Sequence, residues 1–217
     1  MIVRGFVLLW VGLLLSGCMQ AKLDPVSDAN FTARDKKLLA NPPYERASIP
    51  PTYQRQVVQY HRKEAPGSIV VDTDRRYLYY VLPDGKAIRY GAIVGEAAQA
   101  WSGVATIARK EEWPGWTPTE GEKRRLGPLP NYVEGGAHNP MGARGLYLYA
   151  DGKDTLYRIH GTNQPAWIGH AISSGCIRLT NEDVIDLYSR VKMGAIVVVL
   201  GPKQGDSRVA SAGSSPN

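Results

Sequence analysis

Short segments rich in β-branched and aromatic residues recur between residues 68 and 200, and they constrain the fold more than any other feature of this chain. Runs of this kind, bounded by Gly, Pro, Asn or Asp, are typical of β-strands. The segments that we interpret as strands are 68–71, 76–82, 86–94, 103–108, 145–149, 156–160 and 195–200. Pro83-Asp84-Gly85 predicts a hairpin turn between the second and the third. The sequence therefore predicts a mainly β domain.

One segment near the C-terminus departs from this pattern. Residues 181–191 place apolar side chains at helical spacing, with Thr180 or Asn181 as the N-cap. This predicts one clear helix, followed by a buried last strand. Neither a GxGxxG motif nor a P-loop occurs, and the chain contains no repeat. The sequence therefore offers no signal for nucleotide binding.

The N-terminus has the features of an export signal. Residues 1–17 carry one positive charge, Arg4, followed by an apolar run over 6–15 that is too short to span a bilayer comfortably. The run ends in Leu15-Ser16-Gly17-Cys18, which resembles a bacterial lipobox. The resemblance implies that Cys18 is lipidated and anchors the protein to a membrane. An ordinary secretory leader that is cleaved nearby is the alternative.

Composition divides the rest of the chain. Residues 18–66 are polar and interrupted by prolines, which predicts a tether with little core of its own, although part of 53–60 could pack on the domain. Residues 67–202 form the predicted compact domain, and 203–217 are predicted to be a disordered tail. The net charge is +6 without a Lys/Arg block, so nucleic acid is not an expected partner. A mild positive balance suits an anionic polymer such as cell-wall material.

Cys176 is the only cysteine outside the leader, so it has no disulfide partner within the domain. In an exported protein a lone thiol is a liability unless it has a use. A thiol becomes a good nucleophile as its thiolate, beside a base or a helix N-terminus. His160 could supply the base, and the polar run 180–183 could open a helix just after the thiol. A small buried cysteine and a satisfied core histidine are the alternative.

A long stretch with little regular signal lies between residues 110 and 143. A loop of this length in a compact domain is usually functional, so we expect it to form a wall or lid of a substrate groove. Trp113, Trp116 and Asn139 are the candidates for substrate contact in this stretch. The alternative is that the tryptophans only pin the loop to the core.

Two motifs now become recognisable. Ile159-His160-Gly161-Thr162 and Ser173-Ser174-Gly175-Cys176-Ile177-Arg178-Leu179, with sixteen residues from histidine to cysteine, resemble the L,D-transpeptidase catalytic (YkuD) domain family. The likeness extends over about 68–200, and the exported ErfK/YbiS-like members of Gram-negative bacteria are the most similar. It implies a compact β-sandwich or barrel-like domain, an enzyme without a cofactor, and a lipid-anchored periplasmic location.

The resemblance also implies a reaction. Cys176 would attack the bond between diaminopimelate and D-alanine in a peptidoglycan stem peptide and form a thioester. The acyl group would pass to an amine, as a 3→3 cross-link or as attachment of an envelope protein, or to water. His160 would be the base, oriented by a carbonyl around Gly161, and the pair could rest as imidazolium and thiolate. Backbone N–H groups near Ser174 to Cys176 would hold the oxyanion, and Gly175 would permit close approach of the chain.

This sequence departs from the family at one position. Most members have Ser-His-Gly-Cys at the nucleophile, whereas Ser174 stands here in place of the histidine. A hydroxyl cannot carry a proton near neutral pH, so the base role falls on His160. His170 could substitute for the missing ring, or it could be a rim residue.

Two further alternatives follow from the same residues, together with one expectation about metals. Arg178 could bind a substrate carboxylate, or it could pair with an acidic residue and brace the loop. A wall-binding lipoprotein that has lost activity is the alternative to an enzyme. The four histidines are scattered, and no two have helical ligand spacing, so we expect no metal site.

Overall fold

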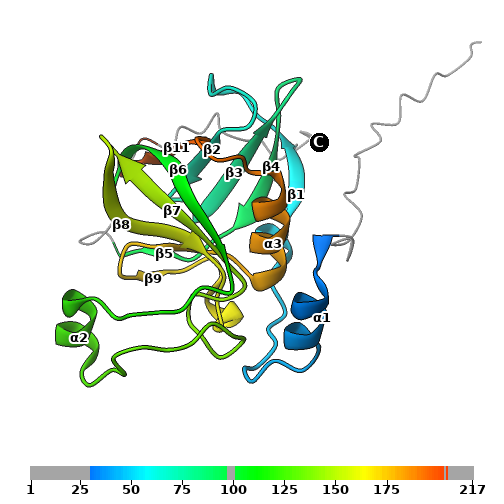
Figure 1. Ribbon diagram of the computed structural model, residues 1–217. Coiled ribbons are helices and arrows are strands. Elements are labelled where there is room, and N and C mark those ends of the chain that lie inside the picture. The colour runs from blue at the N-terminus through cyan, green and yellow to red at the C-terminus, as the bar shows by residue number, and fades with distance from the viewer. Residues whose placement is uncertain (1–29, 97–100, 203, 205–217) are drawn as a thin grey trace, which may run out of the picture.

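The computed structural model describes residues 30–96, 101–202 and 204, which Figure 1 draws in colour. The predicted signal peptide, the predicted lipidation site at Cys18 and the predicted tail, apart from residue 204, lie outside the described residues. Among the helices that the structure does describe, none is both long and apolar enough to cross a membrane.

Strands dominate the described part of the chain, and helices are few and short. The strands are β1 (Gln56–Gln59), β2 (Ile69–Asp72), β3 (Tyr77–Leu82), β4 (Lys86–Gly91), β5 (Val94–Gly95), β6 (Gly103–Glu112), β7 (Arg144–Ala150), β8 (Lys153–His160), β9 (Ala171–Ser173), β10 (Ile177–Arg178) and β11 (Ile196–Leu200). The helices are α1 (Ala33–Ala40), α2 (Glu120–Leu126) and α3 (Asn181–Arg190), with 3₁₀ turns η2 (Pro51–Tyr53) and η3 (Pro165–Trp167). The prediction of a mainly β domain is confirmed.

Nine strands form one sheet in the order β1-β4-β3-β2-β11-β6-β7-β8-β10, and β5 pairs with β9 in a second, small sheet. The last strand, β11, is inserted near the middle. It runs parallel to β2 and antiparallel to β6, so both of its edges are hydrogen-bonded. A strand covered on both edges and largely buried is consistent with the continuous apolar run that predicted it.

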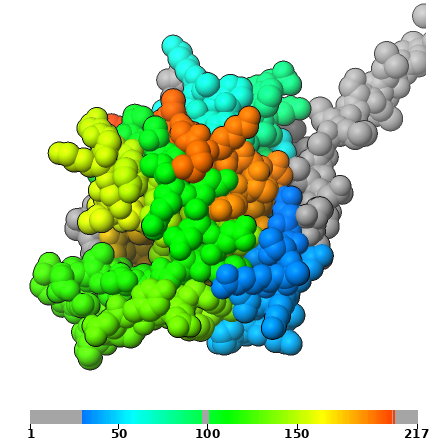
Figure 2. Space-filling view, in the orientation of Figure 1, coloured from blue at the N-terminus to red at the C-terminus, as the bar shows by residue number. Residues whose placement is uncertain are grey.

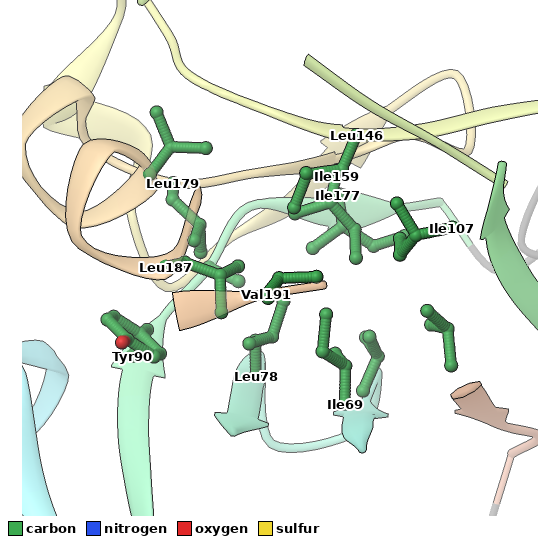
Figure 3. Close-up of a cluster of buried hydrophobic side chains, with 14 of the residues drawn as sticks. Ile69, Leu78, Tyr90, Ile107, Leu146, Ile159, Ile177, Leu179, Leu187 and Val191 are labelled. Carbon is green, nitrogen blue, oxygen red and sulfur yellow. The ribbon is translucent and has the colours of Figure 1, made fainter. Parts of the chain in front are cut away.

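One core cluster receives side chains from both ends of this sheet. Ile69 and Leu78 come from β2 and β3, and Figure 3 shows them facing Ile159 and Ile177, which come from β8 and the β10 edge. Distant strands can share a core only if the sheet curves around it. The curved sheet therefore gives the sandwich or barrel-like architecture that was predicted, and it brings β8 and β10 to one rim of the domain (Figure 1).

Helix α3 forms where the sequence predicts it, and for local reasons. The Thr180 hydroxyl accepts a hydrogen bond from the Asp183 N–H, which caps the first turn. Val184 and Leu187 lie one turn apart and are fully buried in the core. Helix α3 therefore packs into the core of the domain, and its N-terminus follows directly on the segment that contains Cys176.

The prediction of a tether with little core was wrong for α1, whereas the expectation that part of 53–60 packs on the domain is confirmed by β1 and Tyr60. The described part of the predicted tether, residues 30–66, packs on the domain: α1 buries Leu39, and β1 extends the large sheet beside β4. Tyr60 is also buried, in a small apolar cluster on the outer side of the sheet. The chain moreover has helices α1 and α2 besides the expected one. Sequence composition missed the contacts of α1 because their apolar partners lie far away along the chain.

Candidate active site

His160 and Cys176 lie on neighbouring strands. His160 ends β8, and Cys176 immediately precedes β10. The two strands are parallel, and Ile177 lies opposite Ile159. Both isoleucines are buried in the core. Because successive side chains of a strand point to opposite faces, His160 and Cys176 share the other face of the sheet.

The ring of His160 is held in one tautomer. Its Nδ1 lies 2.7 Å from the carbonyl oxygen of Gly161. A carbonyl oxygen can only accept a hydrogen bond, so Nδ1 carries the proton and donates it. The lone pair of the ring is then on Nε2. His160 is 4% exposed, so this orientation is fixed by packing as well as by the hydrogen bond. The result is a histidine prepared to accept a proton through Nε2.

Ser173 shapes the turn that presents Cys176. Its hydroxyl donates to the Cys176 carbonyl oxygen at 2.6 Å and accepts from the Gly175 N–H at 3.1 Å. Gly175 has φ +119°, which L side chains rarely adopt. The predicted role of Gly175 as an oxyanion donor is corrected, because its N–H already donates to Ser173. Sequence reasoning missed Ser173, and its place at the start of the nucleophile motif was the available signal.

Burial governs the protonation of both groups. It lowers the pKa of His160 to about 3, and the charge of Arg178 acts in the same direction, while backbone carbonyls oppose it. Burial also raises the pKa of the Cys176 thiol above its ordinary value of 9.0, although the Arg158 N–H and the charge of Arg178 favour the thiolate. The site therefore favours a neutral imidazole beside a neutral thiol, and not the resting imidazolium–thiolate pair that the sequence left open.

Arg178 lies opposite His160 in the pairing of β8 and β10, so the two side chains are on the same face of the sheet. Among the described residues Arg178 has no acidic partner within ion-pair distance, and its buried Nε has no hydrogen-bond partner. Burial lowers the pKa of the guanidinium, whereas the Cys176 thiolate and Glu122 raise it. Of the two alternatives, no acidic side chain lies within ion-pair distance of Arg178 in the described part of the chain, and contact with a substrate carboxylate stays a prediction.

The stretch between β6 and β7, residues 113–143, carries α2 and borders the site; we call it the covering segment. Arg125 of α2 donates a hydrogen bond to the Ser174 hydroxyl, beside the nucleophile turn. Figure 2 shows a hollow between the surface of β8 and the green surface of α2, with the gold colour of the β9–β10 region at its floor. The covering segment therefore borders this hollow, and the bond from Arg125 to Ser174 joins it to the nucleophile motif.

Two of the three predicted substrate contacts in the covering segment were wrong. Trp113 is 3% exposed, and its indole N–H donates to Asp35, so it pins the segment to the core. Asn139 is fully buried, and its amide donates to the Val133 and Glu134 carbonyls. Each side chain is used to hold the backbone in place. Trp116 is half-buried and remains a candidate for substrate contact.

Asn181 joins three parts of the site and was noted in the sequence only as a possible cap. Its Oδ1 accepts from the Ala143 N–H at 2.8 Å, and its Nδ2 donates to the Thr162 carbonyl at 3.0 Å and to the Tyr44 hydroxyl at 2.8 Å. A Cβ on Gly142 would lie 2.3 Å from that Oδ1. The end of the covering segment and the chain after His160 are therefore held together through one amide.

His170 takes the rim position of the two alternatives. It is exposed, and its ring meets that of Trp167 edge-on, with the ring centroids 5.4 Å apart. Within the part of the chain that the structure describes, no three His, Cys, Asp or Glu side chains gather as they would to hold a metal ion.

A histidine with an available Nε2 near a lone thiol is suited to nucleophilic acyl transfer. The curved β domain that carries this pair matches the family model of the L,D-transpeptidase catalytic domain, YkuD, over residues 66–199. The chain belongs to this family.

Similar proteins of the same description are found in enterobacteria. The chain is 38% identical over 141 residues to the probable L,D-transpeptidase ErfK/SrfK of Escherichia coli K12, across 61% of this chain and 43% of that protein. It is 36% identical over 143 residues to the probable L,D-transpeptidase YbiS of the same strain, across 60% and 43%. The chain thus spans less than half the length of these curated relatives.

A solved structure from Brucella melitensis, described as a probable carnitine operon oxidoreductase, is also similar. The two chains are 46% identical, and the match covers 70% of this chain and 96% of that one, with a TM-score of 0.47. The description is that of the Brucella protein, and a TM-score this low adds nothing to the family assignment.

Proposed function

We propose that this protein is a peptidoglycan L,D-transpeptidase in which Cys176 is the nucleophile and His160 is the general base. Its donor substrate is a tetrapeptide stem, and the bond attacked joins diaminopimelate to the terminal D-alanine. Membership of the L,D-transpeptidase catalytic domain family supports the reaction class. The residue roles rest on the geometry of the site.

One observation carries the proposal: the hydrogen bond from His160 Nδ1 to the Gly161 carbonyl. It leaves Nε2 unprotonated on the face of the sheet that also holds Cys176. A backbone carbonyl thus replaces the acidic third member of a triad, so no carboxylate is needed to orient the ring.

The first half of the reaction forms a thioester. As Cys176 Sγ attacks the carbonyl carbon, its proton passes to His160 Nε2, and negative charge develops on the carbonyl oxygen. His160 then returns the proton to the nitrogen of D-alanine as the carbon–nitrogen bond breaks. The transfer happens during attack, because burial disfavours a charged pair before the substrate arrives.

The second half resolves the thioester. An amine enters, His160 Nε2 takes a proton from it, and the nitrogen attacks the thioester carbonyl. The carbon–sulfur bond breaks, and Cys176 regains its proton from His160. With diaminopimelate of a second stem as the amine, the product is a cross-link between two stems. With an amine of an envelope protein, the product is an attached protein.

Arg178 and Ser174 complete the proposed lining. Arg178 faces the site without an acidic partner among the described residues, and a substrate carboxylate would supply one. Ser174 is bonded to Arg125 and, as a hydroxyl, takes no part in proton transfer. Gly161 orients the base, and Trp116 is the remaining aromatic candidate in the covering segment.

The proposed location is the periplasm of a Gram-negative bacterium, with a lipid anchor on Cys18. The similarity to Escherichia coli relatives supports an envelope protein. The anchor rests on the leader motif alone. A labelled fatty acid incorporated by the full chain and lost in Cys18→Ala would establish it, whereas equal labelling of both chains would remove it.

Transfer to water, which would make the protein a carboxypeptidase or amidase, uses the same thioester. An inactive wall-binding lipoprotein is the candidate of a different class, and Ser174 is the feature that favours it. The retained pair of His160 and Cys176, with the ring held as a base, favours activity over that reading.

The test is a product assay. The full chain is incubated with labelled tetrapeptide muropeptides, and the products are identified by mass spectrometry, with Cys176→Ala and His160→Ala in parallel. We expect release of D-alanine and cross-linked dimers from the wild type and from neither variant. Tripeptide monomers as the only product would assign the acceptor to water. Wild type and Cys176→Ala giving the same muropeptide profile would refute the enzyme reading.

A further inference from the structure

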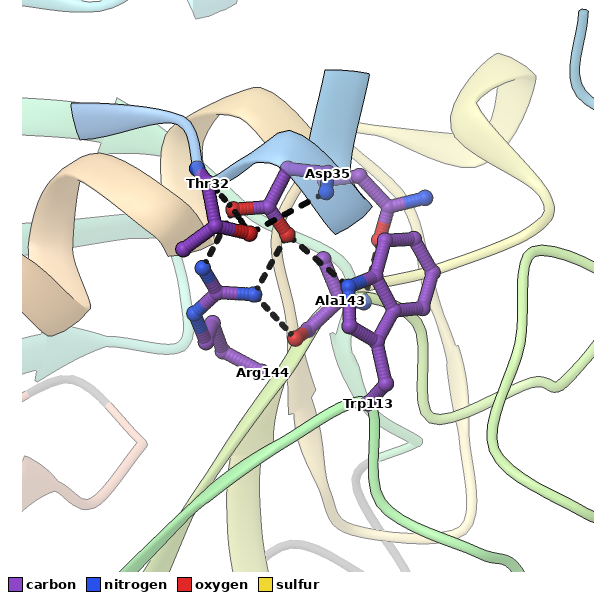
Figure 4. A network of polar contacts seen from close by, with 6 residues as sticks. Thr32, Asp35, Trp113, Ala143 and Arg144 are labelled. Atoms are coloured by element: carbon purple, nitrogen blue, oxygen red, sulfur yellow. Dashed lines mark hydrogen bonds and ion pairs between the residues drawn. The ribbon is translucent and has the colours of Figure 1, made fainter. Parts of the chain in front are cut away.

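Helix α1 places a fully buried carboxylate against the domain. Asp35 is 0% exposed and makes a two-point ion pair with Arg144: Nη1 donates to Oδ1 at 2.8 Å, and Nη2 donates to Oδ2 at 2.6 Å. The indole N–H of Trp113 also donates to Oδ1, at 2.8 Å, and Thr32 donates to Oδ2 through its N–H and its hydroxyl. Figure 4 shows the whole network. Asp35 lies outside residues 66–199, which match the family model.

The two main partners of Asp35 lie at the two ends of the covering segment, one just inside it and one just beyond it. Trp113 is its first residue, directly after β6, and Arg144 is the first residue of β7, directly after its last. The ends are also joined to each other, because the Ala143 carbonyl accepts from the Trp113 N–H at 2.8 Å and from Arg144 Nη1 at 2.7 Å. The Asp35 carboxylate of α1 therefore links the start of the covering segment to the residue that follows its end.

The middle of the covering segment depends on its ends for its position. Helix α2 has no buried residue and is stabilised by its own capping box at Thr119. Arg125 of α2 bonds Ser174 in the nucleophile motif, and the charge of Glu122 acts on Cys176. A helix without a buried face has little packing of its own to fix it. Its place over the thiol follows from where the segment leaves and rejoins the sheet.

A second route leads from Asp35 to the base. The carbonyl oxygen of Arg144 accepts from the Gly161 N–H at 3.1 Å, and the neighbouring Gly145 lies opposite His160 in the β7–β8 pairing. Gly161 is the residue whose carbonyl holds the His160 ring. Asp35 therefore binds the side chain of Arg144, and the backbone carbonyl of Arg144 holds Gly161. Gly161 in turn orients the ring of His160.

We propose that α1 is a positioning element of the active site and that Asp35 is its positioning residue. Asp35 fixes both ends of the covering segment and the start of β7, and so sets α2 over Cys176 and Gly161 beside His160. The catalytic unit of this protein then begins at α1, ahead of the family domain. The turnover measurement below rests on the proposed function, whereas the proteolysis measurement does not.

The test uses the full chain with Asp35→Asn and with Trp113→Phe, which removes the indole hydrogen bond to Asp35 together with part of the buried ring. Two variants are controls. Lys36→Gln changes an exposed neighbour on α1, and Tyr90→Phe removes a buried hydrogen bond to Asp186 away from the covering segment. Trypsin cleavage after the basic residues 123–125 reports the freedom of α2, and kcat and KM report turnover of the tetrapeptide stem.

We expect Asp35→Asn to be cleaved several-fold faster within α2, because cleavage follows the population of the open segment. Misplaced reacting groups should lower kcat by about 10²-fold, with a smaller change in KM. Trp113→Phe should shift both quantities in the same direction by less, and both controls should behave as the wild type. If Asp35→Asn does not fold, Trp113→Phe decides the matter alone.

Unchanged α2 cleavage in folded Asp35→Asn or, failing that, in Trp113→Phe would overturn the inference. Equal acceleration in Tyr90→Phe would overturn it too, because general destabilisation would then explain the effect. A wild type without any turnover would refute the proposed function and leave the α2 cleavage rates to decide the role of α1.

Discussion

The free active site should hold a neutral thiol and a neutral imidazole, and titration tests this directly. Burial lowers the pKa of His160 from 6.5 to about 3, which corresponds to about 5 kcal/mol against charging the ring. It also raises the pKa of Cys176 above 9.0. At about pH 7 the thiolate should therefore be present in no more than about 1% of molecules, and the imidazolium in about one in 10⁴.

The assay is the ultraviolet absorbance of the thiolate as a function of pH, taken as the difference between wild type and Cys176→Ala. Cys18 is present in both chains, so its contribution cancels. We expect no difference signal at neutral pH and a rise only above about pH 9. At neutral pH iodoacetamide should alkylate Cys176 slowly, because the thiolate is the reactive form. Stem-peptide turnover should be retained, because the substrate-bound thiol is deprotonated during attack.

The pH dependence of kcat/KM provides a second reading, because it reports the essential groups of the free enzyme. With the His160 pKa at about 3, the acid limb should lie far below the ordinary histidine range. The lowered pKa of His160 also makes the free energy of unfolding depend on pH. The ring of the unfolded chain takes up a proton below about pH 6.5, so the contribution of His160 to stability is full above that pH and falls toward pH 3. A near-stoichiometric thiolate signal at pH 7, absent in Cys176→Ala, would refute this reasoning.

Three further predictions concern stability. Gly142→Ala should lower the free energy of unfolding, measured by urea denaturation, by more than about 1 kcal/mol, because φ is +62° and the new Cβ would meet Asn181. The control Gly152→Ala should lower it by less, because φ is +72° but the space around the Cβ is open. Asn181→Ala should cost about 1–3 kcal/mol by leaving buried backbone groups unpaired, and an unchanged thermal midpoint would contradict this. Burial alone would raise the pKa of Asp35, but hydrogen bonds and the charge of its arginine partner lower it, so its contribution to stability is complete above about pH 4 and lost as the pH falls further. The urea midpoint should therefore drop more between about pH 6 and pH 3 in the wild type than in Asp35→Asn.

Local patterns predicted what depends on neighbours in the chain. Helix α3 was recognisable because Thr180 caps it and its apolar residues recur at helical spacing. The strands followed from β-branched and aromatic runs, although β6 extends beyond the predicted 103–108 to Glu112. The His160 and Cys176 pair was identified by motif and spacing. Each of these signals lies within some twenty residues of sequence.

The errors arose where a side chain finds its partner far away. Trp113 and Asn139 were predicted to contact substrate because they are large or polar residues in an irregular stretch. The structure buries both, one on Asp35 and the other on backbone carbonyls. Composition alone could not distinguish an aromatic that pins a segment from one that lines a groove, since that depends on what packs beside it.

The sequence by itself determined a mainly β chain with a helix just after Cys176, and it predicted that Cys176 is the nucleophile and His160 its base. Only the tertiary structure decided that α1 packs on the domain and that His160 and Cys176 are buried, which disfavours charge on both. It also decided that one carboxylate of α1 holds both ends of the covering segment. The reason is physical: propensity and periodicity are local, whereas burial, ion pairing and pKa depend on atoms that folding brings together. Asp35 is 78 residues from Trp113 in the sequence and 109 residues from Arg144.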